Sequence, residues 1–184
     1  ETAPVFSSPA EITPNTAVTT GTTLNCSASA TDPEDGVLSP SYEWRVNNAT
    51  IAVGASYVVS ALDTNVGDSL ECRANATDSS GVGIDSSATV VIINSLPVIT
   101  SVTITPNTVS NDSTAQCSFV ATDVDDSPGT PATSVEWGIN NNIVGSSTSI
   151  TLSSGIALPG DVLSCTVSAV DSSAATASAS TTTS

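Results

Sequence analysis

Acidic side chains recur in two groups whose chemistry suits a metal ion. Eight of the 18 Asp and Glu residues form these groups, and each group draws on two separate stretches of chain. The first group is Asp32, Glu34, Asp35 and Asp78, and the second is Asp123, Asp125, Asp126 and Asp171. Carboxylates held close together repel one another unless a cation lies between them, and Ca²⁺ prefers such hard oxygen ligands. The pattern therefore predicts two calcium sites, provided that folding brings the two stretches of each group together.

The alternative is that these acids lie in solvated turns. Asp32-Pro33 and Asp35-Gly36 form turns readily, and acidic loops keep a surface without Lys soluble. Their recurrence in register on two loops favours calcium. Asp68 and Asp161 are weaker candidates, because a turn cap explains each of them as well as a metal ligand does.

The composition excludes several classes of function. The chain has a formal net charge of −16, only two basic residues and no His. Nucleic-acid binding needs clustered Lys and Arg, and without His the Ser and Cys residues lack their commonest general base. Asp32 and Asp35 form a nominal acid and base pair, but their counterparts in the second group indicate shared architecture. We therefore expect no enzyme activity, no small-molecule substrate and no nucleic-acid partner.

An internal repeat sets the elements that must position the acids. Ile12-Thr13-Pro14-Asn15-Thr16 recurs at residues 104–108, Ala30-Thr31-Asp32 at 121–123, and Gly67-Asp68 at 160–161. The offsets stay between 91 and 93 residues, so the chain holds two copies of one unit with insertions confined to loops. We place the two domains at residues 1–94 and 95–184, joined by a short linker around Asn94 to Pro97.

Within each copy, hydrophobic residues alternate with period two, which is typical of β-strands with one buried face. Turn signals such as Asp35-Gly36 and Pro159-Gly160 separate the alternating stretches. About seven short strands per copy predict an all-β chain of two β-sandwich domains. The inward positions include Cys26, Trp44 and Cys72 in the first copy, and Cys117, Trp137 and Cys165 in the second.

The Cys, Trp and Cys of each copy resemble the immunoglobulin-like pattern of a strand-B Cys, a strand-C Trp and a strand-F Cys. With the Ala-Thr-Asp and Gly-Asp signatures, the chain is similar to the tandem Ig-like, PKD-like and cadherin-like repeats of bacterial and archaeal surface proteins. Leu70 and Leu163 depart from antibody-type domains, which carry a corner Tyr two residues before the second Cys. The resemblance implies two tandem Ig-like sandwiches.

It also implies one disulfide in each domain, pairing Cys26 with Cys72 and Cys117 with Cys165. Disulfides follow export to an oxidising compartment, so we expect an extracellular or cell-surface location. Buried free thiols in a reducing cytosol are the alternative. A metal–thiolate site is disfavoured, because tight Cys spacing and His are both absent from the sequence.

In a sandwich of this topology, the acids occupy the B–C and F–G loops at the end of each domain where the chain enters. Asn94 in the linker is then placed to offer a carbonyl to the second site, and Glu1 to the first. A calcium ion held by two neighbouring domains would fix the angle between them, as in the similar cadherin-type repeats.

These features predict an extracellular structural protein of tandem repeats, stiffened by calcium at the junctions, in a surface stalk or filament. Its partners would be further copies of itself or further repeats, continuing head to tail beyond Ser184, and this segment would not insert into a membrane. The alternative is an adhesion or ligand-binding module that uses the loop tips. Asn48, Asn75 and Asn111 match the N-glycosylation pattern; Asn25 also matches but lies beside a Cys expected in a disulfide.

Overall fold

The computed structural model describes residues 2–126 and 129–184, which form strands, turns and loops without any helix. The chain divides into two compact units, unit 1 (Glu1–Ser95) and unit 2 (Leu96–Ser184). The prediction of an all-β fold is confirmed. In the described part of the chain, no helix is long and apolar enough to cross a membrane.

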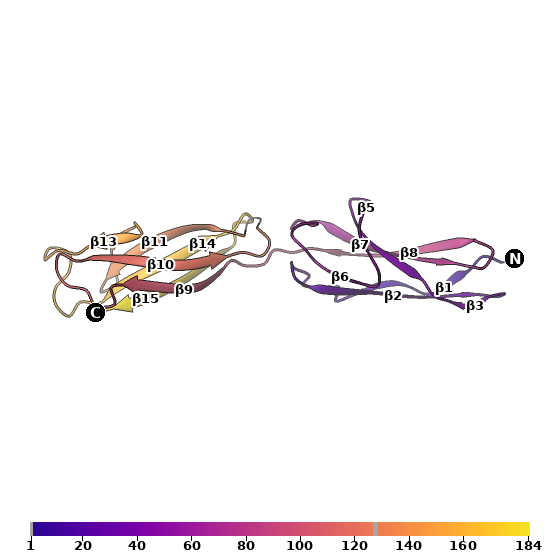
Figure 1. The fold of residues 1–184 in the computed structure, drawn as a ribbon, viewed down its shortest axis with the longest axis horizontal. Helices are drawn as coiled ribbons and strands as arrows, with labels where there is room; N and C mark the ends of the chain where they lie inside the picture. The colour runs from indigo at the N-terminus through magenta and orange to yellow at the C-terminus, as the bar shows by residue number, and fades with distance from the viewer. Residues whose placement is uncertain (1, 127–128) are drawn as a thin grey trace. The chain divides into compact units, whose positions relative to one another are not determined.

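Unit 1 is a sandwich of two antiparallel sheets (Figure 1). Its strands are β1 (Val5–Thr13), β2 (Thr23–Asp32), β3 (Gly36–Leu38), β4 (Ser41–Val46), β5 (Ala49–Val53), β6 (Ser56–Val58), β7 (Ser69–Thr77) and β8 (Gly83–Val91). One sheet has the order β1-β2-β3, and β6 also pairs with β2; the other has the order β5-β4-β7-β8. The short β3 pairs with the last three residues of β2, and β6 pairs near its start.

Unit 2 repeats this order without the extra short strand (Figure 1). Its strands are β9 (Val98–Thr105), β10 (Thr114–Thr122), β11 (Ala132–Ile139), β12 (Asn142–Gly145), β13 (Ser149–Thr151), β14 (Leu163–Val170) and β15 (Thr176–Thr183). Its sheets have the orders β13-β10-β9 and β12-β11-β14-β15. Both units are therefore Ig-like sandwiches of about seven strands, as predicted.

A disulfide and a Trp form the centre of each core. Cys26–Cys72 joins β2 to β7 and Cys117–Cys165 joins β10 to β14, each with a Cα–Cα distance of 6.3 Å. Each bridge therefore links the two sheets of its sandwich. Trp44 and Trp137 are fully buried, and each indole N–H donates to a backbone carbonyl, at 3.0 Å and 2.8 Å respectively. One disulfide per domain is confirmed, with the predicted pairing.

At one equivalent place in the two cores, the large side chain comes from a different strand in each unit. In unit 1, Tyr42 reaches across to β2, where its hydroxyl accepts from Ala28 N at 3.1 Å and donates to Ala28 O at 3.3 Å. In unit 2, the residue two before the Trp is Val135, and the residue two after the first Cys is Phe119. Both of these side chains pack in the unit 2 core. A large residue on one strand thus replaces a large residue on the other.

We therefore expect Ala28→Phe alone to destabilise unit 1 by about 1–3 kcal/mol, because the ring enters space that Tyr42 already occupies. Adding Tyr42→Val should restore most of this loss and give a coupling energy of at least about 1 kcal/mol. Denaturant unfolding of the two single variants and the double variant measures this coupling. Ser27→Phe on the exposed face of β2 is the control. Strictly additive effects would show that the two positions do not share space.

Candidate functional site

The acidic loops of each unit meet at the end where its chain begins. Asp32 ends β2 and Asp78 directly follows β7, so the two lie on different sheets of the sandwich. The loops after these strands are joined by Asp35, whose carboxylate accepts from Ser79 N at 2.7 Å and Ser79 Oγ at 2.9 Å. In unit 2, Asp126 accepts from Ser172 N at 3.3 Å and Ser172 Oγ at 2.5 Å. Folding thus brings the two stretches of each group together.

Two of the four acids in unit 1 are buried, and their own backbone turns hold only one oxygen of each. Asp32 is 4% exposed, and its Oδ1 accepts from the backbone N of Glu34 and Asp35 at 2.8 and 2.9 Å. Asp78 is 6% exposed, and its Oδ1 accepts from Ser80 N, Ser80 Oγ and Val82 N at 2.7–2.9 Å. Within the described residues, Oδ2 of both Asp32 and Asp78 is buried with no hydrogen-bond partner. A buried carboxylate oxygen is costly without a donor or a cation.

Unit 2 repeats this arrangement. Asp123 is 4% exposed, and its Oδ1 accepts from the backbone N of Asp125 at 2.8 Å and of Asp126 at 3.3 Å. Its Oδ2 is also buried, with no hydrogen-bond partner in the part of unit 2 that is described. Asp171 is 7% exposed, and its Oδ1 accepts from the backbone N of Ser173 and Ala175 at 2.9 and 2.7 Å. The buried aspartate pair is therefore a property of the repeat.

Hydrogen bonds favour the charged form of Asp78. The Ser80 hydroxyl contributes most, followed by backbone N–H groups of the same turn, and together they lower the pKa of Asp78 despite its burial. The carboxylate therefore stays ionised at pH values below its usual range. An ionised carboxylate with one free, buried oxygen can act as a cation ligand.

The other predicted ligands serve in different ways. Glu34 is exposed and accepts from Thr2 N at 3.3 Å and Thr2 Oγ1 at 3.0 Å, so it contacts the segment that enters unit 1. Asp35 and Asp126 join loops, as described above. Across residues 2–126 and 129–184, no group of three or more His, Cys, Asp or Glu side chains is placed to hold a metal ion. Asp125 is half-buried, and its backbone N donates to Asp123 Oδ1. The set of four carboxylates around each ion stays a prediction.

The two linker ligands stay predictions. Asn94 belongs to unit 1, where its Nδ2 donates to Ser95 O at 2.5 Å, whereas the acids that it was predicted to assist belong to unit 2. Glu1 lies outside the described residues.

Asp68 and Asp161, at the opposite end of each unit, cap turns. Asp68 Oδ2 accepts from Asn65 N, and Asp161 Oδ2 from Leu158 N, both at 2.8 Å. The bond from Leu158 N, followed by that from the Asn140 amide, lowers the pKa of Asp161. These contacts account for both residues without a metal.

The outer surface of unit 1 carries a charged cluster that the sequence reasoning missed. Arg45 and Arg73, the only basic residues of the chain, lie on the sheet β5-β4-β7-β8. Arg45 contacts Glu43 and Glu71 at 3.8 and 3.9 Å, and Arg73 contacts Glu43 at 3.7 Å and also pairs with Asp85. The bond from Arg73 lowers the pKa of Asp85. Their spacing of every second residue on β4 and β7 was the available signal.

The predicted glycosylation positions differ in exposure. Asn48 lies in the exposed turn between β4 and β5, and Asn111 in an exposed loop before β10. Asn75 lies on β7, and its side-chain amide donates to Asp85 Oδ1 at 2.9 Å. A glycan on Asn75 would disturb that bond, while the other two positions are open. All three stay predictions.

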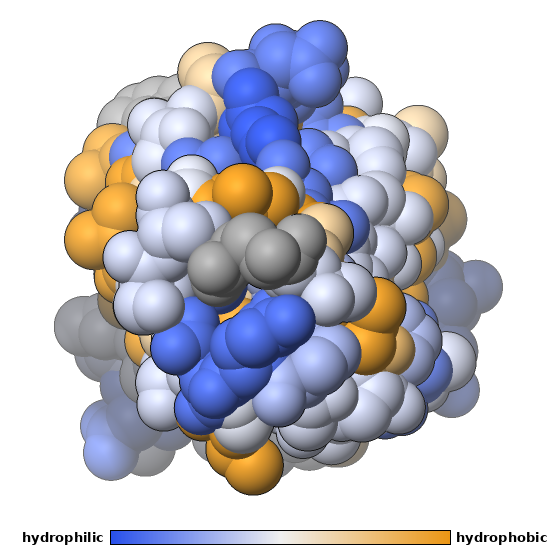
Figure 2. Space-filling model, turned by 90° about the vertical axis from the view of Figure 1, so that its right-hand side faces the viewer, coloured by the Kyte–Doolittle hydropathy of each residue, from blue (hydrophilic) through white to orange (hydrophobic). Residues whose placement is uncertain are grey.

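Figure 2 views the molecule from the side on which the N-terminus lies in Figure 1. Strongly hydrophilic residues (blue) gather in two groups on this face, among weakly polar residues drawn in pale colours (Figure 2). In unit 1, Glu34 and Asp35 are exposed, whereas Asp32 and Asp78 are buried.

No protein-family model matches the chain, and no curated protein matches it. Among solved structures, it is similar to the fibronectin(III)-like modules of Clostridium thermocellum CbhA, with 19% identity over 95% of this chain and 92% of that chain and a TM-score of 0.34. It is also similar to a Ca²⁺-stabilized adhesin by which an Antarctic bacterium binds ice (14% identity, 97% and 48% covered, TM-score 0.32). Mouse protocadherin-24 EC1-3 is a third (9% identity, 96% and 70% covered, TM-score 0.35). At these TM-scores the likenesses carry no inference about function, and the Ig-like fold rests on the strand order and core of each unit.

Proposed function

We propose that the chain is a pair of structural modules from an extracellular surface stalk or filament, stiffened by calcium where successive modules meet. The observation that carries this proposal is the pair of buried aspartates at the end of each unit where its chain begins. In unit 1, Asp32 and Asp78 each leave one buried oxygen without a hydrogen-bond donor among the described residues. Such oxygens are the ligands that Ca²⁺ prefers.

The residues available to hold the ion are Asp32 and Asp78 in unit 1, and Asp123 and Asp171 in unit 2. Two carboxylates supply part of the six to eight oxygen ligands that Ca²⁺ takes, and backbone carbonyls and water commonly supply the rest. The ion would neutralise the repulsion within each pair and tie the loop after one sheet to the loop after the other. It would also lie near the entering segment, which in unit 1 contacts Glu34 through Thr2.

The disulfides support an extracellular setting, because such bridges form and persist in oxidising compartments. The role is mechanical: bridges hold each sandwich together, and calcium restricts bending between modules. Partners would be further modules or further copies of the chain. This function needs no catalytic site.

Calcium should stabilise the chain measurably. Extracellular modules bind Ca²⁺ with dissociation constants of about 0.1–1 mM. At about 2 mM free calcium, a site with a dissociation constant near 0.1 mM adds about 2 kcal/mol to the free energy of unfolding, by mass action. Calorimetry with CaCl₂ or with EDTA should show this gain for the natural chain, and Asp32→Asn or Asp78→Asn should abolish it in unit 1. Identical thermograms in CaCl₂ and EDTA would refute the proposal.

Asp112→Asn is the matched control, because Asp112 is exposed and belongs to neither pair. It should leave the calcium response unchanged. Stiffening is measured separately, by the distribution of distances between spin labels placed one on each unit. Chelation should broaden that distribution in the natural chain. Binding without any change in the distribution would leave a calcium-stabilised module and refute the mechanical role.

A further inference from the structure

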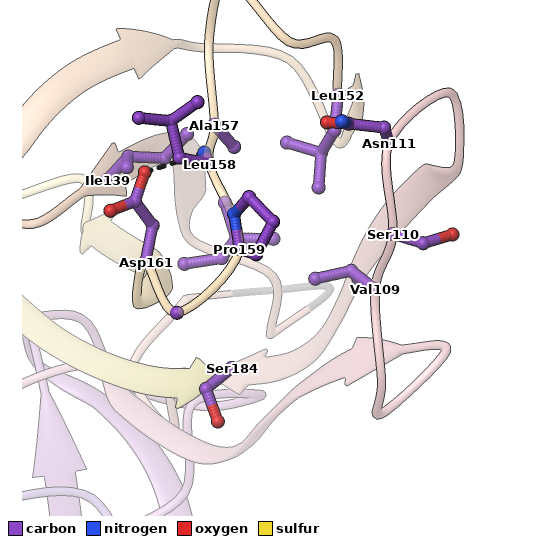
Figure 3. Close-up of a pocket in the computed structure, with 12 residues that line it drawn as sticks. Val109, Ser110, Asn111, Ile139, Leu152, Ala157, Leu158, Pro159, Asp161 and Ser184 are labelled. Carbon is purple, nitrogen blue, oxygen red and sulfur yellow. Dashed lines mark hydrogen bonds between the residues drawn. The ribbon is translucent and has the colours of Figure 1, made fainter.

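Unit 2 has an apolar pocket at the end opposite its acidic loops. The cavity has a volume of about 220 Å³. Its lining includes Val109, Ile139, Leu152, Leu163 and Ser184. Figure 3 shows the side chains of Val109, Leu152 and Pro159 directed into one space from separate segments, with Ser184 below them at the end of β15. The pocket therefore lies beside Ser184, which directly follows β15.

In unit 1, the side chain of Ile92 occupies the equivalent place. Ile92 follows β8, is 1% exposed, and packs in the core with Val18, Val59 and Leu70. At the repeat offsets of 91 and 93 residues, these three correspond to Val109, Leu152 and Leu163, which line the pocket of unit 2.

The register of the last strand agrees with this correspondence. Leu70 pairs with Val90 in unit 1, and Leu163 pairs with Thr183 in unit 2. Val91 therefore corresponds to Ser184, and Ile92 to the position directly after Ser184. A side chain at that position would enter the pocket.

The backbone that holds the segment after β8 is also repeated. In unit 1, Ile92 N donates to Asp68 O at 3.0 Å, Gly67 N donates to Ile92 O at 2.8 Å, and Ile93 N donates to Val18 O at 2.8 Å. In unit 2, the corresponding Asp161, Gly160 and Val109 all line the pocket.

The turn that presents these groups is the same in both units. Asp68 N donates to Asn65 O at 3.1 Å, and Asp161 N donates to Leu158 O at 3.1 Å. In each turn the aspartate carboxylate also accepts from the residue three before it, at 2.8 Å. Unit 2 thus offers the backbone geometry with which unit 1 holds Ile92.

We propose that this pocket binds the aliphatic side chain of an extended segment that continues β15 directly after Ser184, in the way that Ile92-Ile93 continues β8. The segment would pair with Asp161, Gly160 and Val109 through its backbone and place its first side chain among Leu152, Leu163 and Ile139. The cavity is large enough, since an engineered apolar cavity of about 150 Å³ accepts benzene. A polar first residue would bury a group without a partner and would be rejected. This inference does not rest on calcium, which would act at the opposite end of the unit.

The test appends Ile-Ile to Ser184 of the full chain and compares it with appended Ser-Ser. The Ile-Ile extension should raise the melting temperature of unit 2 by roughly 5–15 °C, because it buries one large aliphatic side chain. Ser-Ser should leave the melting temperature unchanged. Hydrogen exchange read by mass spectrometry assigns the change to unit 2 through added protection of residues 157–163.

Equal melting temperatures for the two extensions would overturn the proposal. A separate peptide with the sequence of residues 92–95 tests the other occupant, a segment from a second chain. If this peptide protects residues 157–163 and the Ile-Ile extension does not, the pocket serves a second chain and the proposal fails. If the Ile-Ile extension protects residues 157–163 without any added peptide, the result supports the proposal. EDTA in all samples keeps the result separate from that of the calcium experiment.

Discussion

Replacing Cys26 and Cys72 together by Ala is expected to lower the free energy of unfolding of unit 1 by about 4 kcal/mol. The two residues are separated by 46 positions in the sequence, so the bridge closes a long loop. A cross-link of this length removes many conformations from the unfolded chain, and this loss accounts for most of the stabilisation in the chain-entropy model. Both sulfurs are buried beside the core, so the variant also loses packing.

The effect should be confined to one unit. Denaturant unfolding followed by hydrogen exchange and mass spectrometry gives a separate stability for peptides of unit 1 and of unit 2. The matched control is Cys117→Ala with Cys165→Ala, whose bridge has a sequence separation of 48 and should destabilise unit 2 to the same extent. A loss below about 1 kcal/mol in both variants would mean that the bridges do not constrain the unfolded chain as the entropy model requires.

Most of the fold could be predicted from sequence, because its determinants are periodic or repeated. Alternation with period two reports which face of a strand is buried, and the recurring Cys, Trp and Cys place three strands around one centre. The short β3 could not be predicted. Gly36–Leu38 has three residues and no alternation of its own, and it is a strand only because it pairs with the end of β2.

The candidate site could be predicted in its location but not in its detail. Asp32 and Asp35 lie three residues apart and look alike in sequence, yet one is buried and the other is exposed. Their difference depends on where the turn directs each carboxylate and on which N–H groups it meets. Such local hydrogen bonds form only once the loop has its folded geometry. Residue type and spacing therefore cannot distinguish a buried aspartate that could bind an ion from an exposed aspartate that joins two loops by hydrogen bonds.

The pocket of unit 2 could not be predicted from the sequence either. Three of its lining residues, Val109, Leu152 and Leu163, correspond to core residues of unit 1, so the sequence pattern at these positions is that of a normal core. The difference lies at the position directly after the last strand, where Ile92 fills the core of unit 1. A cavity that depends on one neighbouring side chain becomes visible only when the two cores are compared in three dimensions.

Ile92→Ala is therefore expected to create in unit 1 a cavity like that of unit 2, and to lower the free energy of unfolding of unit 1 by about 2–5 kcal/mol. The side chain is 1% exposed, and its removal leaves space among Val18, Val59 and Leu70. The three hydrogen bonds around this segment involve backbone atoms only, so an Ala variant retains them. The decrease in the free energy of unfolding should therefore measure the contribution of the packing of one side chain.

Val91→Ala is the matched control, because Val91 ends β8 directly before Ile92 and is 57% exposed. It should change the stability of unit 1 by no more than about 0.5 kcal/mol. Denaturant unfolding with hydrogen exchange on peptides of unit 1 distinguishes the two variants. Equal effects of Ile92→Ala and Val91→Ala would mean that unit 1 collapses around the missing side chain, and the pocket of unit 2 would then have no preference for an aliphatic residue. A large loss in Ile92→Ala alone would show how much stability one aliphatic side chain contributes at this end of the sandwich.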